Sequence, residues 1–132
     1  MDKLCSSLLL IVFVSLISAS NAQGQTPTDS LWEVWQDGSA SINERIPALH
    51  DYILYELMQA DKDSAIKYGL ILLDESQRQG AKHDVGRAYK LLGMADYYRG
   101  EYHQAIDEYN LALKIFLETR DSTTYGKQRI GR

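Results

Sequence analysis

The chain has 132 residues, 45% hydrophobic and 24% charged, with only two prolines, so it is neither mostly disordered nor collagen-like and forms at most one modest domain. Eighteen acidic and fourteen basic residues give a formal net charge of −4. General nucleic-acid-binding proteins have a positively charged surface, whereas this chain is acidic, so we expect no nucleic-acid partner.

Residues 1–22 have the order of a secretory signal peptide. Lys3 precedes an apolar run over residues 8–17, and small residues ending in Ala22 follow that run. An uncleaved anchor is the alternative, but about ten strongly apolar residues fall short of the ~20 that a spanning helix needs. We predict cleavage after Ala22. The only cysteine, Cys5, lies in this segment, so we expect no disulfide in the exported chain.

The residues after the signal peptide are predicted to begin with a flexible leader and a short helix. Residues 23–28 are polar and turn-prone, and we interpret them as the leader. Ser30 and Glu33 have the spacing of a capping box, which predicts a helix that carries two tryptophans and ends at Asp37-Gly38.

Four longer helices are predicted from capping residues and from apolar side chains three and four positions apart. They cover residues 41–59, 61–79, 84–98 and 101 onward, and Gly80 and Gly100 suit the turns that follow two of them. No segment alternates as a strand does. Because the connections are short, neighbouring helices should pack antiparallel as hairpins, so we predict an all-α fold.

One stretch resembles a tetratricopeptide repeat (TPR). Tyr89 stands three residues before the pair Leu92-Gly93, and Ala105 stands four residues before Tyr109. Gly93 and Ala105 are small where two helices should cross closely. Asp96 departs from the pattern because it occupies a position where the repeat usually has tyrosine.

Weaker copies of the repeat flank this stretch. Ala65-Ile66 lies forty residues before Ala105-Ile106, and Ile130-Gly131 lies thirty-eight after Leu92-Gly93. The resemblance therefore implies a right-handed α-solenoid over residues 29–132 with about two and a half repeats. A separate helix beginning at Asp121 would open a third repeat that breaks off at Arg132, so we expect the chain to continue in a longer protein. The alternative is that this half-repeat is itself a cap.

No pattern of catalytic residues stands out in the sequence. His50, His83 and His103 fall on three different predicted segments and share no metal-ligand spacing. The neighbouring acids in Asp107-Glu108 and in Asp74-Glu75 point in different directions around a helix, and we interpret them as solvated. We expect no enzyme activity from this segment and no metal or cofactor.

The resemblance also implies a concave groove lined by the first helix of each hairpin, which in TPR proteins binds a peptide or a partner helix. The matching positions here are Arg87, Lys90, Met94 and Tyr97, flanked by His50, Leu54 and Leu57 before them and by Tyr125, Gln128 and Arg132 after them. Three cations on this wall predict a protein or peptide partner that is acidic or ends in a carboxylate. A solvated face, or a wall covered by further chain, is the alternative.

The leader, the repeats and the phrase Asp29-Ser30-Leu31-Trp32-x-x-Trp35 together resemble the N-terminal periplasmic TPR region of Bacteroidetes-type adenylate/guanylate cyclases or histidine kinases. This resemblance implies a sensory module on the periplasmic face of a bacterial membrane, anchored only through a transmembrane segment of the parent protein. Any catalytic domain of such a class III cyclase would lie beyond Arg132. A free periplasmic TPR adaptor is the second alternative.

Overall fold

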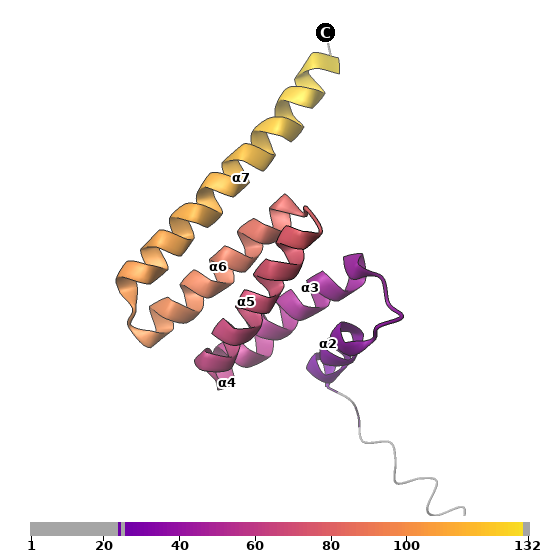
Figure 1. Ribbon diagram of the computed structural model, residues 1–132, viewed down its shortest axis with the longest axis vertical. Coiled ribbons are helices and arrows are strands. Elements are labelled where there is room, and N and C mark those ends of the chain that lie inside the picture. The colour runs from indigo at the N-terminus through magenta and orange to yellow at the C-terminus, as the bar shows by residue number, and fades with distance from the viewer. Residues whose placement is uncertain (1–23, 25, 131–132) are drawn as a thin grey trace, which may run out of the picture.

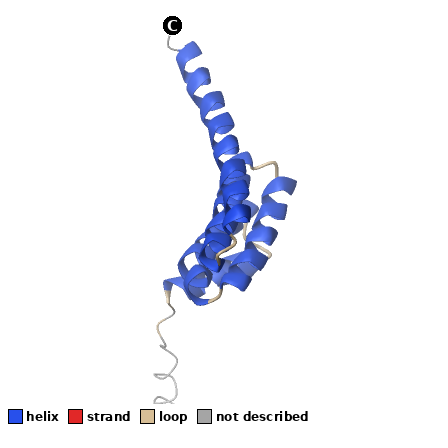
Figure 2. Ribbon diagram, turned by 90° about the vertical axis from the view of Figure 1, so that its left-hand side faces the viewer, coloured by secondary structure: helices blue, strands red, loops and turns tan. Residues whose placement is uncertain are grey.

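The computed structural model describes residues 24 and 26–130, and the predicted signal peptide lies outside them. All regular structure in the described residues is helical, which confirms the all-α prediction (Figure 2). In chain order the elements, shown in Figure 1, are α2 (Pro27–Gln36), α3 (Ile42–Tyr52), the π-helical turn η1 (Ile53–Leu57), α4 (Met58–Ala60), α5 (Lys62–Arg78), α6 (Lys82–Arg99) and α7 (Tyr102–Ile130).

Helix α2 begins four residues earlier than predicted. Thr26 caps it, with the backbone N–H of Asp29 donating to Thr26 Oγ1 at 3.3 Å and the backbone N–H of Thr26 donating to Asp29 Oδ2 at 3.0 Å. Pro27 takes the first helical position, where a residue without an N–H loses nothing. The prediction that residues 26–28 belong to a flexible leader is therefore wrong, because these residues form the capping box.

The second predicted helix is present but contains a turn that the sequence did not indicate. It begins after Ser41, whose N–H and hydroxyl both donate to Glu44 Oε2, at 3.1 and 3.0 Å. Helices α3, η1 and α4 follow one another without an intervening loop, and this helical segment ends at Ala60. The wider turn of η1 carries Ile53 and Leu57 into the interior.

The ends of α5 and α6 follow the predicted glycines. Gly80 and Gly100 have φ angles of +65° and +85°, the left-handed conformation that favours glycine after a helix. Helix α6 starts at Lys82, two residues before the predicted start at Asp84. The two short turns place α5, α6 and α7 antiparallel to their neighbours (Figure 1).

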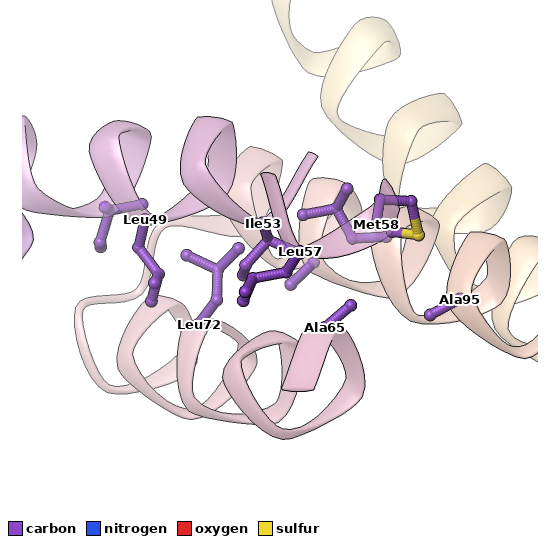
Figure 3. Close-up of a cluster of buried hydrophobic side chains, with 10 residues drawn as sticks. Leu49, Ile53, Leu57, Met58, Ala65, Leu72 and Ala95 are labelled. Atoms are coloured by element: carbon purple, nitrogen blue, oxygen red, sulfur yellow. The ribbon is translucent and has the colours of Figure 1, made fainter. Parts of the chain in front are cut away.

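The core lies between the α3–η1–α4 segment, α5 and α6. Figure 3 shows its side chains converging from these elements, and Leu49, Ile53 and Ala95 are fully shielded from solvent. The larger buried set also contains Ile46, Leu57, Met58, Ala65, Leu72, Ala88 and Leu91. Burial of these apolar groups is the main favourable contribution to folding that the sequence offers.

Close approach of α6 and α7 depends on small residues, as predicted. A Cβ atom added to Gly93 would lie 3.1 Å from the backbone oxygen of Ala105 and 3.2 Å from the ring of Tyr109. Ala105 and Ala112 are 2% and 3% exposed and face α6. Any larger side chain at Gly93 must push the two helices apart.

Helix α7 is continuous from Tyr102 to Ile130, so the predicted separate helix beginning at Asp121 is wrong. No glycine or proline lies between Tyr102 and Thr124 to end the helix. The residues that suggested a new N-terminus, Asp121 to Thr124, are tolerated inside a helix when nothing breaks it. Figure 1 shows α7 running along α6 and projecting beyond it. Within residues 24 and 26–130, no helix combines the length and apolar character needed to cross a membrane.

Candidate binding face on helices α3 and α6

Helices α3 and α6 meet through His50 and Arg87. Arg87 Nη2 lies 2.8 Å from His50 Nδ1, which is also 2.8 Å from Asp51 Oδ1. Burial is the main cause that lowers the pKa of His50, and the positive charge of Arg87 lowers it further against the opposing effect of Asp51. The neutral ring is therefore favoured. Because a guanidinium can only donate, Nδ1 then accepts from Arg87.

Arg87 is paired within the chain. Its Nη1 atom lies 3.3 Å from Asp84 Oδ1, and its Nη2 atom lies 3.7 Å from Asp51 Oδ1. The side chain is 29% exposed, so one edge still faces solvent. The structure thus gives Arg87 two carboxylate partners and one histidine partner within the chain.

The remaining α6 residues of the predicted groove follow the same helical face. Lys90 is exposed, Met94 is half-buried against the core, and Tyr97 is 55% exposed. The ring of Tyr97 contacts those of Tyr98 and Tyr102 edge-on, with centroids 5.8 and 5.6 Å apart. Lys90 and Tyr97 are therefore the two members of the set that present polar groups to solvent.

The predicted flanking residues have other positions. Leu57 is buried in the core, and Leu54 packs against the core, so neither lines an open groove. The backbone of Tyr125 and Gln128 belongs to α7, so these residues do not belong to the first helix of a third hairpin. Arg132 lies outside the described residues.

The docking of α2 depends on aromatic contacts. The ring of Trp32 lies 5.0 Å from that of Tyr52 and 5.3 Å from that of Tyr68, centroid to centroid. The guanidinium of Arg45 lies 4.8 Å from the Trp35 ring, and Arg45 Nε donates to the backbone oxygen of Trp35 at 2.9 Å. These contacts give Tyr52 and Tyr68 a role in holding α2 against the rest of the helices.

A pair of buried carboxyl groups lies between α6 and α7, which sequence reasoning did not predict. Asp96 is 2% exposed, and its Oδ2 atom and Glu108 Oε2 are both buried without a hydrogen-bond donor. Burial raises the pKa of Glu108 to about 7, and the charge of Asp96 and a hydrogen bond between the two carboxyls act in the same direction. The interpretation of Glu108 as a solvated acid is therefore wrong. The only sequence signal was an acidic residue at position 96, amid apolar positions.

The charges around this pair come from three helices. Arg99 on α6 places Nη1 3.8 Å from Asp96 Oδ1 and Nε 3.3 Å from Asp63 Oδ1 on α5. On α7, Gln104 hydrogen-bonds Glu108 and lowers its pKa, whereas Asp107 raises it. One cation thus partly neutralises a group of carboxylates at the end of the hairpin.

The described part of the chain contains no group of three or more His, Cys, Asp or Glu side chains placed to hold a metal ion. No protein-family model matches the chain, and no curated protein or solved structure shows significant similarity to it.

Proposed function

We propose that this chain is a non-catalytic protein-interaction module that binds an acidic or carboxylate-ended peptide along α6. The contact between His50 and Arg87 is the observation that supports this proposal best. The distance of 2.8 Å between Arg87 Nη2 and His50 Nδ1 holds α3 beside α6. This contact fixes a polar face on which Lys90 and Tyr97 are exposed. The TPR resemblance of the sequence supports the same use of this face.

Lys90 is the principal cation of the proposed face. Asp51 and Asp84 already neutralise Arg87, so an incoming carboxylate gains less from Arg87 than from Lys90. The phenol of Tyr97 lies on the same face and can donate a hydrogen bond to a peptide oxygen. The role of Arg87 is to position the face, because its contacts with His50 and Asp51 hold α3 against α6.

The test uses peptides with unblocked carboxyl termini, selected from a display library on the wild-type chain. Lys90→Glu should raise the Kd of a selected acidic peptide by at least about tenfold in fluorescence polarisation, since a charge-assisted hydrogen bond becomes a repulsion. Lys67→Glu makes the same charge change on an exposed position of α5 and should leave the Kd unchanged. Arg87 is left intact because its removal would strand two carboxylates.

Two outcomes would contradict the proposal. One is a library from which no peptide is selected. The other is equal weakening by Lys90→Glu and Lys67→Glu, which would show a response to net charge alone. Amidation of the peptide carboxyl terminus separates recognition of a chain end from recognition of acidic side chains.

We further propose that the module is the sensory part of an exported or membrane-anchored bacterial signalling protein. This part of the proposal rests on the signal-peptide pattern and on the resemblance to periplasmic regions that precede class III cyclase or histidine kinase domains. Reading the coding sequence past Arg132 tests it. A spanning segment followed by an output domain is expected, and a stop codon there would favour a free adaptor.

A further inference from the structure

Helix α7 carries a second apolar face that the rest of the described chain leaves exposed. Tyr102, Ile106, Leu113 and Leu117 are exposed by 58%, 55%, 56% and 43%, respectively. At 100° per residue, these four side chains leave the helix within an arc of about 60°. The small residues Ala105 and Ala112, which face α6, lie on a different side of α7. We call the four exposed residues the α7 stripe.

The α7 stripe has the same spacing when it is read in either direction. Tyr102 and Ile106 are four residues apart, and so are Leu113 and Leu117. A two-fold axis that passes beside the α7 stripe, level with the midpoint between Tyr109 and Asn110, would therefore place Ile106 opposite Leu113 of a second copy. The same axis would place Tyr102 opposite Leu117. A face that matches itself in this way is what a two-fold interface requires.

Charges beside the α7 stripe select the antiparallel orientation. Asp107 and Lys114 lie on the same flank of the stripe, one on each side of the proposed axis. In an antiparallel pair, each Asp107 lies beside Lys114 of the other copy. In a parallel pair, this flank of one copy and the same flank of the other lie on opposite sides of the interface, so the two charges do not meet and the pairing is lost. More broadly, residues 101–110 contain three acids and no lysine or arginine, whereas residues 111–120 contain two cations and one acid.

From this register and charge pattern we propose that the α7 stripe is a homodimer interface, covered by the α7 stripe of a second copy in antiparallel orientation. The interface lies on α7, whereas the proposed peptide face lies on α3 and α6. The dimer would therefore present two peptide faces, each on its own copy. Failure of one proposal leaves the other standing.

The register is tested by mixing two single-cysteine chains. In a Cys5→Ser background, one chain carries Ile106→Cys and the other carries Leu113→Cys. Mild oxidation of the mixture should give a covalent dimer joining the two variants, because these positions face each other in the proposed register. Either variant alone should give little dimer, since its two cysteines would be about 10 Å apart along the axis. Preferential dimers of each variant with itself would overturn the antiparallel register.

The surface is tested by a matched pair of leucines. The purified chain is expected to be a dimer in sedimentation equilibrium at about 100 μM, and Leu113→Glu should raise the dimer Kd by at least about tenfold. Leu70→Glu on α5 changes a leucine of similar exposure, 53% against 56%, and should leave the Kd unchanged. Circular dichroism of both variants confirms that the helices are retained.

The charge pairing is tested by a swap. Lys114→Asp should weaken the dimer, and the combined change Asp107→Lys with Lys114→Asp should restore it. A monomeric wild-type chain at 100 μM, equal effects of Leu113→Glu and Leu70→Glu, or no rescue by the swap would each overturn the proposal. A monomeric chain that binds a different purified protein through the α7 stripe would also overturn it and would identify another occupant.

Discussion

The carboxyl groups of Asp96 on α6 and Glu108 on α7 lie beside each other between two helices, at a place where the sequence pattern leads one to expect an aromatic ring. Ionisation of both groups sets two negative charges against each other in a partly shielded site. Arg99 offsets only part of this repulsion, since its nearest nitrogen is 3.8 Å from Asp96. The packing of α6 on α7 should therefore depend on pH.

Stability should fall as pH rises through the range in which Glu108 ionises. Its pKa increases from 4.5 when unfolded to about 7 when folded, so folding favours the protonated form. The favourable contribution of protonated Glu108 to the free energy of unfolding is complete below pH 4.5, decreases up to about pH 7 and is lost above that. Glu108→Gln should flatten this part of the Tm profile and raise Tm at pH 8. Glu56→Gln changes an exposed acid and should leave both the profile and the Tm at pH 8 unchanged. An unchanged Tm profile in Glu108→Gln would contradict the proposed repulsion between Asp96 and Glu108.

Replacing Gly93 by leucine should destabilise the chain by about 2 kcal/mol, because the added atoms meet the backbone of Ala105 and the ring of Tyr109. Chemical denaturation monitored by circular dichroism gives the free energy of unfolding. Gly38→Leu is the control, since a Cβ atom there meets nothing within 4 Å. Equal loss in both variants would show that α6 and α7 do not cross closely at Gly93.

Loss of the Trp32 ring should release α2. This helix contains no buried residue, and its contacts with Tyr52 and Tyr68 are made through that ring. Trp32→Ala should cost about 2 kcal/mol and should increase hydrogen exchange in α2 while the α5 and α6 amides stay protected. Val34→Ala shortens an exposed side chain on the same helix and should change little. Uniform loss of protection would instead make α2 part of one cooperative unit.

The pKa of His50 should rise when the positive charge of Arg87 is removed. That charge is one of the causes that lower the His50 pKa, after burial, and Asp51 acts in the opposite direction. In Arg87→Met, NMR titration of the His50 ring should therefore show a higher midpoint than in the wild-type chain. Lys90→Met removes a cation that does not contact the ring and should leave the midpoint in place. A fall in Arg87→Met would contradict the proposed hydrogen bond.

Much of the fold could be predicted because its signals are local. Ser41 with Glu44 and Asp61 begin two helices, and the glycines at positions 80 and 100 adopt the left-handed turn that follows two others. Each of these features depends on a few neighbouring residues. The close approach at Gly93 was also predictable, because small residues recur where helices cross.

The remaining features depend on competition between signals or on distant partners. Thr26 and Ser30 both fit an N-cap, and Pro27 decides between them by suiting the first helical position. Asp121 resembles a cap, but a helix continues unless something stops it. Glu108 is partly buried because α7 packs on α6, which also brings Asp96 beside it, and no local pattern encodes that contact.

The projection of α7 beyond α6 divides the helix into a held part and a projecting part. The ring of Phe116 lies 5.4 Å from that of His83 at the start of α6, so α7 is held against α6 from the turn at Gly100 to that residue. The backbone from Phe116 to Ile130 is about 21 Å long, and a tilt of about 5° there displaces its tip by about 2 Å. Glu108 lies in the held part, so ionisation of the pair that it forms with Asp96 acts on helix packing and leaves the direction of the tip to the contact at Phe116.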